Sequence, residues 1–499
     1  MASATIPIIV LFRNDLRVSD NRALAAAADT GKPVIPLFIL DEEAPHARPA
    51  GAAGRWWLHH SLAALGKSLE KFGSRLFLRR GKTEKIVAEA IKAAGADTVF
   101  WNRRYAPWDI SVDKSLKSRL RIDGLVAESF DGFLLHEPSL LATQSGDFYK
   151  VFTPFYKQLA NYEPRDPVDA PTSLVEWKGT PYSEELDSFE LLPKRPDWSR
   201  GLAARWQPGE DGALARLIAF LDDRLEGYAE NRDKPGEDGT SCLSPHLAHG
   251  EITPARIMAA LQRKQSRDAE TFRKELAWRE FSYHLLFHHP ELRCESFRPA
   301  FDAFEWRSAP AALKAWQRGQ TGYPIVDAGM RQLWQTGWMH NRVRMITASF
   351  LIKDLLIDWR SGEKWFWDTL VDADEANNPA SWQWVAGSGA DAAPYFRIFN
   401  PVLQGEKFDP QGNYVRHYVP ELAKLPDRYV HRPWETPTTL LRASGLELGK
   451  DYPLPIVEHA KARDRAMEAY RATRTRLSGS TNDPTSRDVR TTSIQKGTP

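Results

Sequence analysis

Cysteine and long apolar runs are both scarce in this chain. Of its 499 residues only two are cysteines, Cys242 and Cys294, and they form no CxxC pair. Two such cysteines cannot build a disulfide framework, which favours a reduced, cytoplasmic setting over secretion. The longest apolar stretch after the N-terminus, residues 345–357, is interrupted by Lys353 and Asp354. We therefore expect no membrane span.

A net charge of one sign is also absent. The 67 lysines and arginines nearly balance the 65 aspartates and glutamates, which leaves a formal charge of +2. No global basic excess attracts nucleic acid, so any such partner has to bind a local patch. With 42% hydrophobic and 26% charged residues, the composition is typical of a soluble globular protein. The length favours two or three domains.

The chain lacks the motifs of several enzyme classes. No GxGxxG follows the first apolar run, and neither a GxSxG motif nor a Walker loop is present. A standard dinucleotide site, acyl transfer and P-loop chemistry are therefore unsupported. His284 and His288 have the i, i+4 spacing of shared metal ligands, but no HExxH motif surrounds them. We expect both to pack within an aromatic-rich helix, and we predict no metal site.

The chain does contain an alternation of short apolar runs with helical stretches up to residue 129. The predicted strands occupy residues 7–12, 34–40, 75–78, 98–101 and 125–129. Apolar strands separated by helices indicate a parallel sheet that is covered on both faces. We predict a doubly wound α/β domain with a five-stranded parallel sheet over residues 1–133.

The rest of the chain divides into three parts. Prolines are dense between residues 160 and 209, so we predict a long interdomain linker over residues 134–205. Amphipathic stretches then continue to about residue 476, which predicts an all-α domain over residues 206–476. Residues 477–499 offer no apolar face and are predicted to form a disordered tail. Most of the 18 tryptophans we assign to packing.

Two short segments carry residues suited to nucleotides. Residues 239–244 offer three hydroxyls before a helix, an arrangement that suits a phosphate but equally makes an ordinary N-cap. Glu275 and Trp278 share one helix face at i, i+3. An acidic acceptor beside a flat aromatic recognises a nucleobase by its edge and by stacking. In isolation, a half-buried tryptophan beside a solvated glutamate is the commoner case.

Further polar and aromatic residues gather near residue 340 and after residue 370. Asn341 and Met345 share a helix face and are flanked by two arginines. Residues 371–384 combine acids, amides and tryptophans. Residues 387–401 are rich in glycine, aromatics and amides without helical periodicity. A salt-bridged surface accounts for the first two segments, but it does not account for the third.

Four segments of the chain resemble the photolyase/cryptochrome family, and especially its bacterial cyclobutane pyrimidine dimer photolyases. These segments are residues 12–21, 321–331, 337–345 and 389–401, and the likeness covers residues 6 to 470. The resemblance implies an α/β antenna domain, a long linker, and an α-helical domain that holds FAD in a folded conformation.

The resemblance also implies roles around the FAD. The residues that would line its phosphates and ribityl chain are Tyr228, Thr240, Ser241 and Ser244. Arg344 and Asp372 would form an ion pair beside the isoalloxazine ring, with Asp374 near its polar edge. Asn378 matches the residue that faces flavin N5, where a neutral amide stabilises a reduced, anionic flavin without the repulsion of a carboxylate.

The activity implied by the resemblance is light-driven DNA repair, in which reduced FAD gives an electron to a flipped-out dimer and the cyclobutane bonds split. The residues that match the lesion pocket are Glu275, Trp278, Asn341, Met345 and Trp384. Those that match the basic groove for DNA phosphates are Arg232, Arg342 and Arg397. Those that match the chain carrying electrons to oxidised flavin are Trp382, Trp359 and Trp306. The predicted catalytic residues are Glu275, Asn378 and these three tryptophans.

Residues 341 and 345 predict which lesion is repaired. Family members that repair (6-4) photoproducts place histidines at these two positions, because reversing that lesion requires proton transfer. Asn341 donates no proton at neutral pH, and Met345 has none to give. We therefore predict repair of cyclobutane pyrimidine dimers in UV-damaged DNA, by a monomer without an obligate protein partner.

The antenna chromophore and the function class each leave alternatives. Asp109 falls where a pterin-binding carboxylate is expected, which favours methenyltetrahydrofolate, while a deazaflavin or a second flavin remains an alternative. A cryptochrome-type blue-light receptor would share the fold and FAD, but Asn378 and the short segment after Arg476 disfavour it. A flavin electron-transfer protein without DNA would leave the Glu275 and Trp278 pair unexplained.

Overall fold

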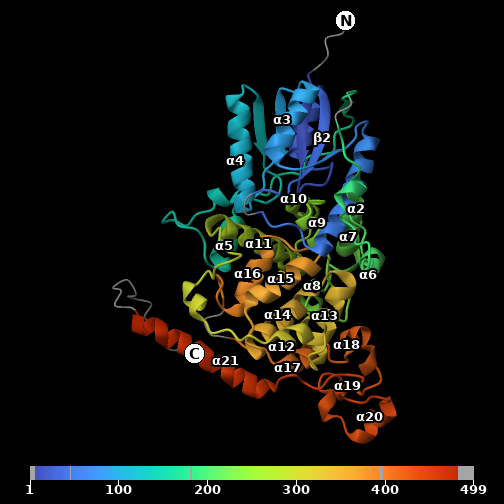
Figure 1. Cartoon of the computed structure of the whole chain (residues 1–499), viewed down its shortest axis with the longest axis vertical. Helices are drawn as coiled ribbons and strands as arrows, with labels where there is room; N and C mark the ends of the chain where they lie inside the picture. The colour runs from blue at the N-terminus through green and yellow to red at the C-terminus, as the bar shows by residue number, and fades with distance from the viewer. Residues whose placement is uncertain (1–5, 45–46, 180–181, 393–396, 481–499) are drawn as a thin grey trace.

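The computed structural model of the protein describes residues 6–44, 47–179, 182–392 and 397–480. An α/β domain forms one end of the molecule and a larger helical body forms the other (Figure 1). Within the described residues no helix has the length and apolar character needed to span a bilayer.

The α/β domain is built on a parallel sheet with strand order β3-β2-β1-β4-β5. Its strands are β1 (Ile8–Phe12), β2 (Pro33–Leu40), β3 (Phe77–Arg80), β4 (Thr98–Asn102) and β5 (Val126–Phe130). Ile8 of β1 is paired with Val34 of β2 on one side and with Thr98 of β4 on the other. The predicted five-stranded parallel sheet is therefore confirmed.

Helices cover both faces of this sheet, as a doubly wound fold requires. They are α1 (Arg22–Asp29), α2 (Ala52–Lys71), α3 (Thr83–Ala94) and α4 (Pro107–Ile122). Val10 of β1 joins the core cluster that contains α1 and α2 residues. Its neighbour Leu11 joins the cluster that contains α3 and α4 residues. Successive side chains of a strand point to opposite faces, so β1 is buried throughout.

The segment between the two domains carries more structure than its prolines predict. Its elements are η1 (Pro138–Leu140), α5 (Phe152–Leu159), β6 (Val175–Glu176), η2 (Leu186–Phe189) and α6 (Arg200–Arg205). Strand β6 pairs with the start of β2 and adds a short sixth strand that the sequence did not predict. A strand of two residues has no periodicity to detect, so only its pairing partner reveals it.

The helical body is assembled from many short helices around α11 (Arg267–His288) and α13 (Pro324–Thr336). The other α-helices before residue 400 are α7 (Glu210–Asp223), α8 (Tyr228–Asn231), α9 (Ser244–Ala248), α10 (Pro254–Leu261), α12 (Pro310–Gln317), α14 (Asn341–Ser349), α15 (Trp359–Thr369) and α16 (Asn377–Ala386). After residue 400 come α17 (Pro401–Phe408), α18 (Asn413–Tyr418), α19 (Asp427–Val430), α20 (Thr438–Ser444) and α21 (His459–Ser480). The remaining turns are η3 (Pro299–Ala303), η4 (Phe350–Asp354), η5 (Pro420–Leu422) and η6 (Pro433–Glu435).

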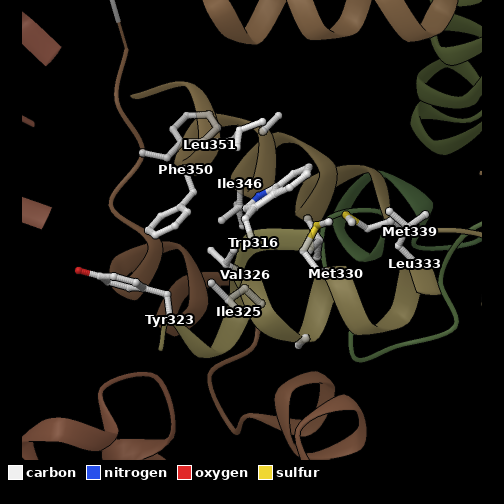
Figure 2. Close-up of a cluster of buried hydrophobic side chains, with 14 of the residues drawn as sticks. Trp316, Tyr323, Ile325, Val326, Met330, Leu333, Met339, Ile346, Phe350 and Leu351 are labelled. Atoms are coloured by element: carbon white, nitrogen blue, oxygen red, sulfur yellow. The ribbon is translucent and has the colours of Figure 1, made fainter. Parts of the chain in front are cut away.

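The largest core cluster lies between α12, α13 and α14. Figure 2 shows Trp316 from α12 lying over Val326 and Met330 of α13, with Ile346 of α14 beside them. All four side chains are at most 1% exposed. This packed core supports the helices that form the wall of the functional site.

Two boundaries differ from the sequence pattern. The amphipathic stretch over residues 340–357, which by itself favours one helix, is α14 followed by a π-helical turn, η4, which ends at Asp354. Helix α21 continues to Ser480, whereas the sequence predicts a disordered tail from residue 477. Extending an existing helix needs no new nucleus, so a few residues without an apolar face can continue it. Residues 481–499 of the predicted tail lie outside the described residues.

Candidate functional site

A cavity of about 540 Å³ lies inside the helical body. Its walls come from α8, the segment before α9, one face of α11, the start of α14, the loop after Leu370, and α16. The predicted site residues that line it are Tyr228, Arg232, Thr240, Ser241, Ser244, Glu275, Trp278, Asn341, Arg342, Arg344, Met345, Asp372, Asp374, Asn378, Trp382 and Trp384. Residues spread over more than 150 positions of sequence therefore share one space.

One end of the cavity carries hydroxyl groups. Ser244 Oγ donates to Asp372 Oδ2 at 2.6 Å and receives a hydrogen bond from Trp338 Nε1 at 3.3 Å. Ser241 Oγ accepts from the backbone N–H of Leu243 at 3.4 Å. Helix α9 has Leu243 at its N-cap and no side-chain capping bond. These hydroxyls therefore do not form the ordinary N-cap that the sequence left open, and they face a space suited to phosphates.

Burial keeps the Tyr228 phenol neutral at this end of the cavity. The side chain is 6% exposed, and desolvation raises the pKa of Tyr228. A neutral phenol offers both a donor and an acceptor to a ligand.

The predicted ion pair in the lining of the cavity is present. Arg344 Nη2 lies 2.8 Å from Asp372 Oδ2 and 3.1 Å from Oδ1. Arg344 Nε also donates to the Met339 carbonyl at 2.7 Å, which fixes the plane of the guanidinium. The two opposite charges neutralise each other, so the pair supplies directed hydrogen-bonding groups without a net charge.

Asp374 lies just before α16, and Asn378 lies in its first turn. The Asp374 carboxylate accepts from the backbone N–H groups of Ala376 and Asn377, and burial raises its pKa. Asn378 Nδ2 donates to Glu363 Oε1 at 2.8 Å and to the Glu363 carbonyl at 3.2 Å. Both amide hydrogens are thus directed to Glu363, so the amide can offer only its Oδ1 acceptor to a ligand in the cavity.

The other end of the cavity combines aromatic and charged groups. Trp278 stacks on Phe152 with ring centroids 3.6 Å apart and planes at 5°. Glu275 forms an ion pair with Arg232. Trp278 is half-buried, as is common for a tryptophan at such a position, and it also lines the cavity.

The predicted phosphate-binding arginines already have acidic or aromatic neighbours. Arg342 Nη2 lies 2.8 Å from Asp233 Oδ2, and its Cζ lies 4.5 Å from the centroid of the Phe408 ring. Arg397 is exposed and lies outside the large cavity, in a small adjoining pocket that shares Trp384 with it. Its carbonyl accepts from the buried Lys353 Nζ at 2.7 Å, so the backbone at Arg397 is anchored beside the rim.

The three predicted electron-carrying tryptophans differ in burial, and one of them lines the cavity. Trp382 lines the cavity and is 2% exposed, Trp359 is fully buried, and Trp306 is half-buried. Trp382 and Trp359 belong to the largest core cluster, and Trp306 packs against it. Two rings that the sequence did not single out, Phe366 and Trp316, also contact Trp382, with centroid distances of 4.9 and 6.2 Å.

Asp109 lies elsewhere, in a second cavity of about 250 Å³. This cavity opens at the carboxyl ends of β1 and β2 and is also lined by Trp108 and by Trp367 of the helical body. Asp109 is paired with Arg104 at 2.5 Å, and burial raises its pKa. The carboxyl ends of parallel strands are the usual ligand-binding edge of such sheets.

His284 and His288 have the packing role expected from the sequence. Their rings meet edge to face with centroids 4.7 Å apart. His284 Nε2 accepts from the backbone N–H of Tyr149 at 3.0 Å, and burial lowers the pKa of His284 to about 4. The described residues hold no group of three metal-ligating side chains here or elsewhere.

Glu363 and Arg48 are the site residues that sequence reasoning missed. Glu363 contacts Asn378 directly, and Arg48 pairs with Glu363 although 315 residues separate them. Neither residue stands in a motif, so no local signal could have found them. A buried ion pair between distant residues, such as Arg48 and Glu363, can be identified only when the tertiary contacts are known.

Comparison with known proteins identifies both halves of the chain. Residues 8–172 match the family described as DNA photolyase, and residues 272–472 match the family described as the FAD binding domain of DNA photolyase. A deoxyribodipyrimidine photo-lyase of Agrobacterium fabrum is 58% identical over 95% of this chain and 99% of its own. Cryptochrome-1 of Arabidopsis thaliana is 38% identical over 92% of this chain and 70% of its own.

A solved structure gives the same result for the fold. The crystal structure of a bacterial class III photolyase from Agrobacterium tumefaciens has a TM-score of 0.92 and 58% identity, and the match covers 95% of this chain and 99% of that one. The resemblance first inferred from four short segments thus extends over nearly the whole length. The chain belongs to the photolyase/cryptochrome family and combines an α/β photolyase domain with a helical FAD-binding domain.

Proposed function

We propose that this chain is a light-driven DNA-repair lyase that splits cyclobutane pyrimidine dimers. The observation that carries the proposal is the single large cavity, which holds the predicted flavin residues and the predicted lesion residues in one continuous space. Reduced FAD, when bound there, supplies the photoexcited electron. The relative with 58% identity is itself named a deoxyribodipyrimidine photo-lyase.

The cavity's donor set fits FAD. Hydroxyls of Thr240, Ser241 and Ser244 bind the phosphates and ribityl chain at one end. The Arg344–Asp372 pair orients the isoalloxazine ring. Asn378 would present its amide oxygen at N5, where it can accept a hydrogen bond from the N–H of the reduced ring without adding charge. These residues bind and orient the ring and change no covalent bond themselves.

The lesion occupies the open end of the same cavity. Trp278 offers the ring face that Phe152 leaves uncovered, and Trp384 lines the same cavity. Glu275 accepts hydrogen bonds from N–H groups on the edges of the flipped-out bases. Its pairing with Arg232 holds the carboxylate in place.

Arg232, Arg342 and Arg397 hold the DNA backbone at the rim. Arg342 exchanges Asp233 for a phosphate when DNA binds, so part of its charge is already compensated in the free protein. Clustering these three arginines at the rim supplies positive charge locally, which is how a chain with a net charge of +2 binds a polyanion.

The lining of the cavity favours cyclobutane dimers over (6-4) photoproducts. Among its described lining residues there is no histidine. The neighbouring His340 is 2% exposed, and burial lowers its pKa to about 4, so it is neutral at pH 7. Its Nδ1 accepts from the backbone N–H of Arg342. No imidazolium is therefore available beside Asn341 and Met345 to donate a proton.

The test uses the FAD-loaded protein, reduced without oxygen, and two duplex oligonucleotides that carry one cyclobutane dimer or one (6-4) photoproduct. We expect near-UV or blue light to restore the dimer-bearing strand and to leave the (6-4) strand unchanged, with no reaction in the dark. Absence of light-dependent dimer loss from reduced, FAD-loaded protein would overturn the proposal. Efficient (6-4) reversal would overturn the role given to Asn341 and Met345.

The second cavity is where we propose that an antenna chromophore binds, with methenyltetrahydrofolate as the favoured ligand. Asp109 accepts hydrogen bonds from the N–H groups on the edge of a pterin. Trp108 and Trp367 provide flat surfaces on which the pterin ring can stack. Arg104 holds the Asp109 carboxylate before the ligand arrives. The absorption spectrum of protein loaded with this folate, compared with Asp109→Asn, tests the assignment. A folate band of equal strength in both proteins would exclude Asp109.

We further propose that the chain acts as a monomer in the cytoplasm. Neither cysteine forms a disulfide, with Cys242 buried and Cys294 exposed. Light scattering of the FAD-loaded protein at several concentrations measures the mass directly. A mass above that of one chain, 56.6 kDa, would contradict the monomer.

A further inference from the structure

Asn378 is held in place by a carboxylate that is itself buried. Glu363 is 4% exposed, and it takes both amide hydrogens of Asn378, one on Oε1 and one on its backbone carbonyl. An ionised carboxylate can only accept hydrogen bonds. As long as Glu363 is ionised, the Asn378 amide must therefore keep its nitrogen towards Glu363 and its oxygen towards the flavin cavity.

The charge of Glu363 is balanced from the other domain. Arg48 lies in the loop between β2 and α2 and forms a two-pronged pair with Glu363, with Nη1–Oε1 at 2.6 Å and Nη2–Oε2 at 3.0 Å. The Arg48 side chain is 15% exposed, and that of Glu363 is 5% exposed. A two-pronged pair away from water fixes both partners in position as well as in charge.

The loop that carries Arg48 is docked firmly on α15. The Arg48 guanidinium lies 4.0 Å from the centroid of the Trp367 ring, and Trp367 Nε1 donates to the Pro49 carbonyl at 2.9 Å. The backbone N–H of Ala52 donates to Asp368 Oδ1 at 3.0 Å. These contacts hold the guanidinium where Glu363 needs it.

Arg48 also lies near a second acid, the half-buried Glu375. Glu375 lies two residues before the start of α16. Its carboxyl group interacts electrostatically with Arg48, Arg293, Asp109 and Glu363. Without Arg48, the carboxyl groups of Glu363 and Glu375 would interact with less positive charge near them. Like charges in a dry site favour protonation of one of them.

We propose that Arg48 is a positioning residue for the flavin: by keeping Glu363 ionised, it orients the Asn378 amide with its oxygen towards N5. The proposal rests on the flavin role given to Asn378 above. If Glu363 were protonated, its O–H would donate to Asn378 Oδ1, and the amide would turn its nitrogen towards the flavin. N5 carries a hydrogen in the reduced flavin and accepts one in the oxidised flavin, so the amide oxygen favours the reduced ring.

The consequence is a link from the antenna domain to the redox properties of the flavin. Arg48 lines the second cavity while its partner Glu363 contacts Asn378 in the first. Removing the guanidinium therefore lowers the midpoint potential of the bound flavin, and it makes a protonated Glu363 detectable in the infrared spectrum.

The experiment compares FAD-loaded Arg48→Met and Arg48→Lys with the parent protein. Arg48→Met should lower the flavin midpoint potential and produce a new carboxylic-acid band, which Glu363→Gln in the same background should abolish. Arg48→Lys should restore the potential and remove the band, because any cation that reaches Glu363 keeps it ionised. The matched control is Arg55→Met, which breaks an ion pair with Glu42 in the same domain and should leave the potential unchanged.

Two results would overturn the proposal. One is an unchanged midpoint potential in Arg48→Met that still binds FAD, and the other is a lowered potential without a new carboxylic-acid band. If Arg48→Met loses FAD, Arg48→Gln, which keeps a planar polar group over Trp367, has to show the same band and shift. Neither readout uses DNA, so failure of repair in the parent protein would refute the proposed function and leave this test intact.

Discussion

At the scale of single residues, the most consequential side chain is Trp382. It is the predicted electron-carrying tryptophan that lines the flavin cavity, and it is almost completely buried. Phenylalanine fills most of the same volume but is much harder to oxidise. We therefore expect Trp382→Phe to block photoreduction of oxidised FAD by an external reductant, while dimer repair by chemically pre-reduced protein persists.

Trp316→Phe is the matched control for this prediction. Trp316 is also fully buried, its ring contacts that of Trp382, and it does not line the cavity. Both substitutions remove a similar core volume, so only the redox role differs between them. Absorption spectra recorded during illumination measure the effect, and normal photoreduction in Trp382→Phe would contradict the assignment.

Substitutions at Trp278 and at Arg342 should distinguish recognition of the lesion from general binding of DNA. Trp278→Ala should weaken binding of dimer-containing DNA by about 1–3 kcal/mol, the value of one stacking platform, and change undamaged DNA little. Arg342→Ala should weaken both DNAs and lower the salt dependence by about one charge, because one phosphate contact is lost. It also leaves Asp233 near the phosphates without Arg342 beside it. Equal losses of both DNAs in the two variants would show that this division is wrong.

At the scale of elements, the contact between α15 and α16 sets the position of Trp382. A Cβ added at Gly362 would lie 2.1 Å from Trp382 Cη2 and 2.6 Å from Leu351 Cδ2. Overpacking of this kind costs about 1–3 kcal/mol. We expect Gly362→Ala to lower the free energy of unfolding by this amount and to slow photoreduction, because the indole must move.

The control for Gly362→Ala is Gly66→Ala in the middle of α2, where an added Cβ meets nothing within 4 Å. There the substitution should raise the free energy of unfolding by about 0.5–1 kcal/mol, since alanine loses less conformational entropy in a helix. Chemical denaturation of both variants measures the difference. Similar effects at the two positions would remove the packing argument.

The elements themselves show what sequence can and cannot predict. The run 7–12 is uninterrupted and apolar, so its strand and its burial follow from local pattern alone. The same holds for the face of α11 that carries Glu275 and Trp278, which are both found in the cavity. Periodicity and spacing act within a single element, so they predicted the strand and the shared helix face, whereas the lesion role of Glu275 and Trp278 came from the family resemblance.

Contacts between elements were beyond the reach of local pattern. Phe152 covers one face of Trp278, and Arg48 compensates Glu363 from another domain. Such partners are separated by more than 100 residues, and nothing in their neighbouring sequence marks them. The roles of Asn378 and Trp382 came from the family resemblance, which carries tertiary information that one sequence read by itself does not.

At the scale of the whole molecule, buried neutral histidines make stability depend on pH. His284 on α11 accepts from Tyr149 in the segment between the domains, and burial lowers its pKa to about 4. Between pH 6.5 and 4 the unfolded chain binds a proton that the folded protein does not, so stability falls as the pH is lowered. One such group contributes at most about 1.4 kcal/mol per pH unit.

His284→Gln isolates this contribution, because its side-chain carbonyl can still accept from Tyr149. We expect the difference in unfolding free energy between the parent and this variant to shrink as the pH falls from 6.5 to 4. Glu280, whose pKa burial raises to about 7, acts in the opposite direction in both proteins and cancels in the difference. A difference that does not change with pH would contradict the assignment.

The two domains also share a core, and this core forms part of the flavin cavity wall. Trp57 of α2 is fully buried against Trp206, His246 and His249, and its Nε1 donates to Glu251 at 3.0 Å. The same cluster includes Cys242 and Trp338, which line the cavity. The α/β domain therefore supports the cofactor site from outside the helical body.

Trp57→Ala tests this coupling. Deleting the buried indole should cost about 3–5 kcal/mol of stability, and it should also weaken FAD retention, because Cys242 and Trp338 lose the ring behind their cluster. Trp177→Ala is the control: Trp177 is half-buried and contacts Phe77 in the sheet's other core, so stability should fall less and FAD retention should stay unchanged. FAD release during dialysis, measured beside unfolding, distinguishes the two. If both variants keep FAD equally well, the α/β domain does not support the cofactor site in this way.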